Sequence, residues 1–164
     1  MTMIGPLMGD VGGLALTAED REVLSHPLVG GVILFARNYN EPGQLRALCD
    51  ELLQLKSPRL LIAVDHEGGR VQRFRVGFTR IPAMVTLSRV YEESATRAVE
   101  EARAHGATVG RELATFGIDL CFAPVLDLDC GISTVIGDRA FSADPRIVIE
   151  LARAFRAGPG RSSG

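Results

Sequence analysis

Apolar segments that alternate with amphipathic ones constrain the fold of this chain more than any other feature. Residues 60–64 are all apolar, so a strand formed there needs both of its faces buried. The segments rich in strand-forming residues lie within residues 3–13, 30–40, 59–65 and 118–129. The segments with helical periodicity lie within residues 17–27, 40–56, 92–116 and 143–158. Strands that are apolar throughout and alternate with helices predict a parallel β-sheet covered by helices.

Capping residues mark the ends of several expected helices. Thr17, with Asp20 three residues later, predicts a capped start of the first helix. Asp144 followed by Pro145 predicts the start of the last one. Gly117 predicts the C-terminal cap of the long helix that ends near residue 116.

Polar residues follow several of the expected strands and help to choose between two architectures. An open doubly wound sheet places its ligand beside one switch point, whereas a barrel gathers residues from many strand ends around one mouth. The residues in question are Arg37 and Asn38, then Asp65, His66 and Glu67, and then Asp127 and Asp129. No G-x-G-x-x-G motif opens a helix after a strand. The pattern therefore favours an α/β fold of the TIM (β/α)8 barrel family.

The length of the chain fits only part of such a barrel. A complete barrel takes about 250 residues, whereas these 164 residues supply about four β/α units. We expect residues 1–157 to form the N-terminal half of a TIM barrel. Residues 158–164 have no periodicity and consist mostly of small or flexible residues, so we expect an irregular tail there.

Composition narrows the possible partners and the compartment. The net charge is −2 and the basic residues are spread along the chain, which argues against nucleic acid and anionic membranes. No apolar run approaches the roughly 18 residues of a membrane span, and the N-terminus has no signal-peptide pattern. Cys49, Cys121 and Cys130 have no metal-binding spacing and are expected to be thiols. We expect a cytoplasmic protein without a metal site.

Asp65 is the strongest candidate for chemistry because it directly follows the apolar strand. A carboxylate held rigidly at a strand end can accept hydrogen bonds from two sugar hydroxyls, or act as an acid, base or nucleophile. The competing interpretation is an ion pair with Arg70 or Arg73.

The stretch that follows Asp65 offers supporting groups. Gly68 and Gly69 allow either a tight turn or a close approach to a ligand. If this loop is helical, Arg70 and Arg73 share a face, and one can bind a carboxylate or sugar oxygen while the other holds Asp65. Glu67 is either such a brace or a catalyst, and His66 is expected to be structural or exposed.

Two further groups belong to the segment after the fourth strand. Asp127 is expected to face the barrel mouth, because Pro124 ends the strand early, and it forms with Asp65 a possible carboxylate pair of a glycosidase. Any two acids at strand ends meet that description, so the pair is a weak signal. Arg139 lies in the "IGDRAF" loop, and its chemistry alone does not decide between a structural and a functional role.

Four segments together resemble the N-terminal part of bacterial β-N-acetylhexosaminidases of glycoside hydrolase family 3. They are "HPLVGGVILFARNYNEPGQLRAL", "AVDHEGGRVQRFRVGFTRIPA", "GIDLCFAPVLDL" and "IGDRAFSADP", and in the family's order they span about residues 5–157. The stretch D-x-E-G-G-R-V-Q-R is distinctive by itself.

The resemblance implies a fold, a reaction and three binding residues. The implied enzyme is a TIM barrel that removes terminal, non-reducing β-linked N-acetylglucosamine from muropeptides during cell-wall recycling in the cytosol, with retention of configuration. The resemblance also implies that Asp65 binds sugar hydroxyls instead of attacking carbon, and that Arg73 and Arg139 contact the substrate. Asp127 matches a structural position at the mouth. No metal or organic cofactor is implied.

The resemblance further implies that the catalytic residues lie beyond residue 164. In the family a histidine on a mobile loop is the general acid/base, and the nucleophilic aspartate lies near the seventh strand. We therefore expect the 164-residue polypeptide to be inactive alone. Two alternatives stay open: a noncatalytic sugar-binding remnant, and a half-barrel that self-associates through its exposed sheet edges.

Overall fold

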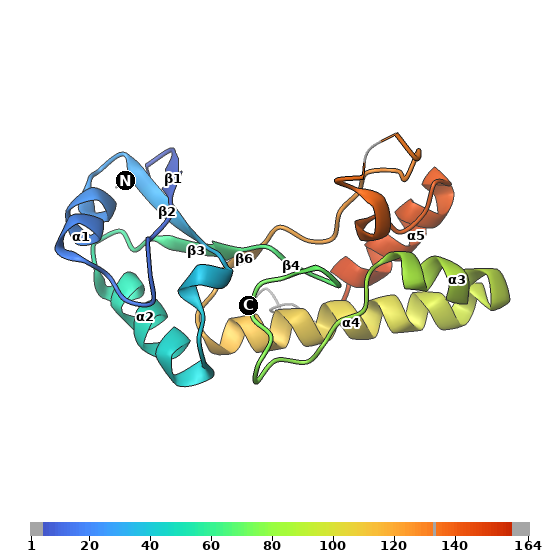
Figure 1. Cartoon of the computed structure of the whole chain (residues 1–164), viewed down its shortest axis with the longest axis horizontal. Helices are drawn as coiled ribbons and strands as arrows, with labels where there is room; N and C mark the ends of the chain where they lie inside the picture. The colour runs from blue at the N-terminus through green and yellow to red at the C-terminus, as the bar shows by residue number, and fades with distance from the viewer. Residues whose placement is uncertain (1–4, 133, 159–164) are drawn as a thin grey trace. The chain divides into compact units, whose positions relative to one another are not determined.

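The computed structural model describes residues 5–132 and 134–158, which form two compact units (Figure 1). The first unit contains the chain up to Asp65 together with Arg73–Phe78 and Leu113–Cys121. The second contains His66–Gln72, Thr79–Glu112 and the chain from Phe122 onward.

A parallel four-stranded sheet forms the centre of the first unit. Its strands are β1 (Leu7–Gly9), β2 (Val29–Leu34), β3 (Leu61–Val64) and β6 (Leu120–Cys121), in the order β1-β2-β3-β6. Each neighbouring pair is parallel, with Val32 opposite Ile62 and Val64 opposite Cys121. The predicted parallel sheet is therefore confirmed.

Two helices accompany this sheet, α1 (Ala18–Ser25) and α2 (Pro42–Gln54), and a short 3-10 helix (Ala36–Asn38) follows β2. Their fully buried side chains form a core with those of the strands. This core includes Leu24, Val32, Leu34, Leu45, Leu48, Leu52, Ile62 and Val64. Because β2 is buried along nearly its whole length, it has no polar face, as the apolar run predicts.

The predicted capping residues lie where the sequence places them. The Thr17 hydroxyl accepts a hydrogen bond from the Asp20 N–H, and the Asp20 carboxylate accepts one from the Thr17 N–H, which is a capping box. Asp144 caps α5 (Pro145–Arg156), whose first residue is Pro145. Gly117 has a φ of +74°, so the left-handed cap needs glycine.

The second unit contains a short hairpin and three helices. Strand β4 (His66–Gly68) pairs with β5 (Val71–Gln72) in antiparallel fashion. The helices are α3 (Val85–Glu93), α5, and α4 (Ala95–Thr115), whose last three residues belong to the first unit. Fully buried side chains of this unit include Met84, Leu87, Ala98, Ala102, Phe141 and Leu151.

The structure divides the long helix expected over residues 92–116. Ser94 is extended, with a φ of −160°, and it separates α3 from α4. Its N–H closes α3 on the Val90 carbonyl, while its hydroxyl accepts a hydrogen bond from the Arg97 N–H. Ser94 thus ends one helix and caps the next, a role that serine favours over a helix interior. The helix α3 and the hairpin were absent from the expected elements.

The fourth strand is shorter than the apolar segment that predicts it. Hydrogen bonding to β3 ends at Cys121, before Pro124, which has no N–H to donate.

The last helix, α5, ends at Arg156, one residue before the predicted domain boundary at residue 157. Residues 159–164 of the expected tail lie outside the described residues. None of the helices in residues 5–132 and 134–158 has the length and apolar composition of a bilayer-spanning segment.

Candidate functional site

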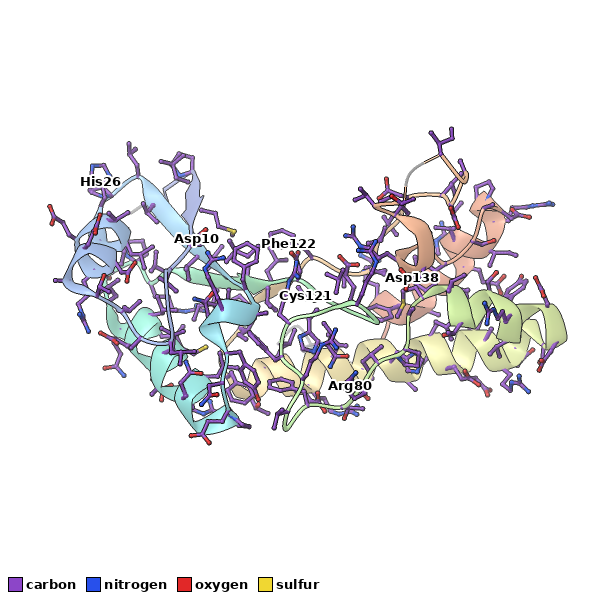
Figure 2. The ribbon with its side chains drawn as sticks, viewed as in Figure 1. Asp10, His26, Arg80, Cys121, Phe122 and Asp138 are labelled. Atoms are coloured by element: carbon purple, nitrogen blue, oxygen red, sulfur yellow. The ribbon has the colours of Figure 1, made fainter. Side chains whose placement is uncertain are left out.

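The polar residues after β2 hold the loop that follows β1. Arg37 forms an ion pair with Asp10 at 3.0 Å (Asp10 is labelled in Figure 2). Asn38 is fully buried, and its amide donates to the carbonyls of Val11 and Gly13 at 2.9 and 2.8 Å. These two strand-end residues therefore have a structural role within the first unit.

Asp65 and Arg73 form an ion pair at the carboxyl end of β3. The Arg73 Nη2 donates to the Asp65 Oδ2 at 3.0 Å, and 24% of the Asp65 side chain stays accessible. Of the two partners that the sequence offers, Arg73 is thus the one that binds Asp65. The pair combines a carboxylate that accepts with a guanidinium that donates, which suits adjacent hydroxyl groups of a sugar.

The Arg73 guanidinium contacts an aromatic ring as well as Asp65. Its centre lies 5.8 Å from the ring centroid of Phe35, the residue directly after β2, within range of a cation–π interaction. Its Nε is buried and has no hydrogen-bond partner among the described residues. Arg73 is therefore held by a carboxylate and an aromatic ring while one of its donors is unsatisfied.

The stretch between Asp65 and Arg73 is a hairpin, so it is not the helical loop that would place Arg70 and Arg73 on one face. Gly68 and Gly69 have φ values of +99° and +54°, which permit the turn. A Cβ on Gly68 would lie 2.6 Å from the Pro82 carbonyl oxygen. Both glycines therefore serve a turn and a close backbone approach, but the approach is to the chain itself.

Glu67 and Arg139 form a bidentate ion pair in the second unit. The Arg139 Nε donates to the Glu67 Oε2 at 2.8 Å, and its Nη2 donates to the Glu67 Oε1 at 2.7 Å. Glu67 is 3% exposed and Arg139 is 22% exposed. The fork-on-fork geometry fixes the plane of the guanidinium. Of the two roles that the sequence leaves open for Glu67, the structure favours the brace.

Arg70 binds the same loop as Arg139 but at the surface. Its Nε donates to the Asp138 Oδ1 at 3.0 Å, and its Nη2 donates to the Val135 carbonyl (Asp138 is labelled in Figure 2). Both side chains of this pair are nearly half exposed. Arg70 thus belongs to the anchoring of the Arg139 loop.

His66 is 1% exposed in β4. Burial lowers its pKa to about 4, and the nearby Glu112 carboxylate offsets part of this effect. The imidazole is therefore neutral at neutral pH, in agreement with the structural role expected for it.

The buried imidazole predicts a pH dependence of stability. The unfolded chain binds this proton more tightly than the folded chain, so acidification from pH 6.5 towards pH 4 favours unfolding. Between pH 7 and pH 5 we expect a loss of about 2 kcal/mol in the free energy of unfolding. Urea titrations of the wild type and His66→Gln at both pH values measure it. Equal losses in the two proteins would contradict the assignment.

Asp127 lies exposed in the irregular segment after β6. Asp65 belongs to the first unit and Asp127 to the second, so the carboxylate pair of a glycosidase stays a prediction. The same holds for a common pocket that unites Asp65 and Arg73 with Arg139. Within residues 5–132 and 134–158, no group of three or more His, Cys, Asp or Glu side chains is arranged to hold a metal ion.

Sequence reasoning missed Gln72, a buried amide that connects the hairpin to the following loop. Its Nε2 donates to the Thr79 carbonyl at 2.8 Å and its Oε1 accepts from the Ile81 N–H at 3.0 Å. It also missed that Glu67 pairs with Arg139, 72 residues away. In the sequence, Gln72 and Glu67 are recognisable only as polar residues with apolar or glycine neighbours. That pattern suggests burial but does not identify the distant residue to which each one binds.

The fold and these strand-end groups define a class: the first β/α units of a barrel with polar residues at the carboxyl ends of its strands. Residues 4–161 match the family model of the glycosyl hydrolase family 3 N terminal domain. The chain belongs to glycosyl hydrolase family 3, so the resemblance seen in the sequence is confirmed.

Curated relatives are similar along almost the whole chain. The beta-hexosaminidase of Thiobacillus denitrificans is 58% identical over 94% of this chain and 43% of its own length. That of Aromatoleum aromaticum is 57% identical over 94% of this chain and 44% of its own length. The chain therefore spans less than half the length of these relatives, and their names are those of enzymes.

Solved structures have the same fold. NagZ from Neisseria gonorrhoeae, in complex with N-trifluoroacetyl-D-glucosamine, has a TM-score of 0.92 and 47% identity over 94% of this chain and 46% of its own. A family 3 beta-N-acetylglucosaminidase from Paenibacillus has a TM-score of 0.81 and 32% identity, over 92% of this chain and 29% of its own. Because the N-domain of NagZ is a TIM barrel, the predicted barrel class is confirmed.

Proposed function

We propose that this chain forms the N-terminal part of a β-N-acetylhexosaminidase. The substrate is a muropeptide, from which the enzyme removes terminal, non-reducing β-linked N-acetylglucosamine during cell-wall recycling. Membership of family 3 and the names of the relatives support the reaction class. The observation that carries the proposal is the partly accessible Asp65–Arg73 pair at the end of β3.

The three candidate residues have distinct parts in the proposed recognition of the sugar. Asp65 accepts hydrogen bonds from hydroxyl groups through its accessible carboxylate. Arg73 donates to the sugar while it stays paired with Asp65. Arg139 is a substrate contact whose guanidinium plane is fixed by the buried Glu67.

The bond-breaking groups of the proposed enzyme lie outside these 164 residues. A retaining glycosidase needs a nucleophile and a general acid/base on either side of the glycosidic bond. General acid/base assistance contributes about 10²–10⁴-fold by itself. We therefore propose that the 164-residue polypeptide alone has hydrolysis near background.

The proposal also assigns the reaction to the cytoplasm. The structure has no disulfide among Cys49, Cys121 and Cys130, all of which lie in its described part. Burial raises the pKa of the Cys49 thiol to about 12, which makes this group unreactive. A buried, unreactive thiol is compatible with a reducing compartment.

A binding measurement tests the role of Asp65. Isothermal titration of the 164-residue polypeptide with N-acetylglucosamine should show saturable binding, and Asp65→Asn should weaken it about 10- to 100-fold, since a hydrogen bond to a charged group contributes about 1.5–3 kcal/mol. Asp127→Asn is the matched control, because it alters an exposed aspartate and should change the affinity less than about twofold.

Two results would count against the proposed function. The first is binding that Asp65→Asn and Asp127→Asn affect equally, because Asp65 would then have no special role. The second is release of a chromogenic aglycone from a β-N-acetylglucosaminide by the 164-residue polypeptide at the rate of a complete relative. Binding without turnover is the expected result.

A further inference from the structure

A basic groove lies between helices α4 and α5, and we call it the α4–α5 groove. Its volume is about 500 Å³, and all of its lining residues belong to the second unit. The lining side chains that matter here are Val99, Arg103, Arg146, Ile149, Glu150 and Arg153. On each helix they recur at intervals of three or four residues, so the groove is formed by one face of each helix.

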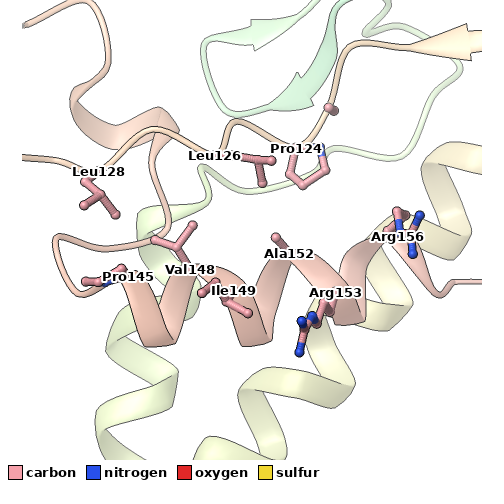
Figure 3. Close-up of a pocket in the computed structure, with 10 residues that line it drawn as sticks. Pro124, Leu126, Leu128, Pro145, Val148, Ile149, Ala152, Arg153 and Arg156 are labelled. Carbon is pink, nitrogen blue, oxygen red and sulfur yellow. The ribbon is translucent and has the colours of Figure 1, made fainter.

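The groove combines charge with accessible apolar surface. Ile149 is 50% exposed, and Arg153, one turn later on α5, is also exposed. The same two residues line a neighbouring apolar hollow beside Pro124 and Leu126 (Figure 3). A ligand in the α4–α5 groove can therefore contact a guanidinium group and a hydrocarbon side chain together.

The groove is positively charged, although the whole chain has a net charge of −2. Three arginines and one glutamate are its charged lining residues. Arg146 pairs with Asp144 at 3.3 Å, so Arg103 and Arg153 supply the positive charge that is available to a ligand.

Arg103 and Arg153 have no hydrogen-bond or ion-pair partner within residues 5–132 and 134–158. Arg97 on the same helix as Arg103, by contrast, binds Glu93 at 2.6 Å. Two unpaired guanidinium groups on the walls of one groove repel each other, and a bound anion offsets that repulsion. The arrangement therefore favours an anionic ligand.

Tyr91 on α3 holds the glutamate of the groove. The Tyr91 hydroxyl donates to the Glu150 Oε2 at 2.7 Å. Arg146 and Arg153 lie four and three residues from Glu150 on α5, at the spacing of ordinary helical ion pairs. Because Glu150 binds Tyr91 instead, it does not neutralise Arg153.

We propose that the α4–α5 groove binds a phosphate monoester that carries an apolar group. Such a phosphate has a charge of about −1.5 to −2 near pH 7 and three strong acceptor oxygens. Arg103 and Arg153 bind different oxygens from the two helices, since guanidinium groups suit phosphate geometry. The apolar group contacts Val99 and Ile149. None of these residues belongs to the proposed sugar site, so the inference is independent of the proposed function.

Isothermal titration of the 164-residue chain with phenyl phosphate tests the proposal. We expect saturable one-to-one binding, and weaker binding of inorganic phosphate, which has no apolar group. Arg103→Gln and Arg153→Gln should each weaken phenyl phosphate binding about tenfold, because each removes charged hydrogen bonds. Glu150→Gln should strengthen it about threefold, because it removes a negative charge from the groove.

Arg97→Gln is the matched control. It removes the same charge from an arginine of α4 that is 51% exposed and does not line the groove. It should change the affinity less than twofold, and circular dichroism should show that all four variants fold.

Four results would overturn the proposal. The first is the absence of saturable phenyl phosphate binding. The second is equal weakening by Arg97→Gln and Arg153→Gln, which would show that only the net charge matters. The third is equal affinity for inorganic phosphate and phenyl phosphate, which would remove the apolar group from the assignment. The fourth is tighter binding of a tetraglutamate peptide, with the same dependence on Arg103 and Arg153, which would assign the groove to an acidic peptide.

Discussion

Gly106→Ala should destabilise the protein by about 3 kcal/mol or more, the upper range for an overpacked site. A Cβ at residue 106 would lie 1.8 Å from the Phe155 carbonyl oxygen and 2.7 Å from the Phe155 carbonyl carbon. Both atoms are backbone of helix α5, so no side-chain rotation relieves the overlap. Helices α4 and α5 would have to separate, and the core between them would lose contacts.

Gly110→Ala is the control for this prediction. Gly110 lies on the same helix, and a Cβ there meets nothing within 4 Å. This variant should be stabilised by up to about 1 kcal/mol, because alanine favours a helix interior over glycine. Urea unfolding of both variants, followed by circular dichroism, measures the two changes. Stabilisation of both variants would show that α4 and α5 do not approach closely at Gly106.

Glu67→Gln should cost about 3 kcal/mol of unfolding free energy. The change removes the charge from a carboxylate that is 3% exposed and receives two hydrogen bonds from Arg139. Breaking one partner of a buried ion pair leaves the other charge uncompensated in a poorly solvated place, which typically costs about 3–5 kcal/mol. We take the lower value because 22% of the Arg139 side chain is exposed.

Asp138→Asn supplies the comparison within the same unit. Asp138 pairs with Arg70, but 47% and 48% of the two side chains are exposed, so solvent screens the charges. The expected cost is less than about 1 kcal/mol. Denaturant unfolding of both variants at neutral pH compares the pairs. Equal losses would mean that the Glu67–Arg139 pair is no more than a surface contact.

Local chemistry explains which predictions the structure confirms. The helix caps depend on backbone groups within a few residues of the capping side chain or glycine. The roles of Thr17, Asp144 and Gly117 can therefore be recognised from the residues next to them in the sequence. The apolar run of β3 likewise contains enough information to predict a buried parallel strand. Family membership was predictable for a different reason, because four distinctive segments occur in one order.

The sequence by itself therefore determined the parallel sheet, the helix ends marked by Thr17, Gly117 and Asp144, and the barrel family. It also supplied the candidates Asp65, Arg73 and Arg139. Only the tertiary structure decided that Asp65 takes Arg73, that Glu67 holds Arg139, and that Ser94 divides the long helix. The physical reason is range. Periodicity and capping reflect interactions between residues that lie a few positions apart in the sequence. Glu67 and Arg139 lie 72 positions apart, so only the folded backbone determines that these two charges meet.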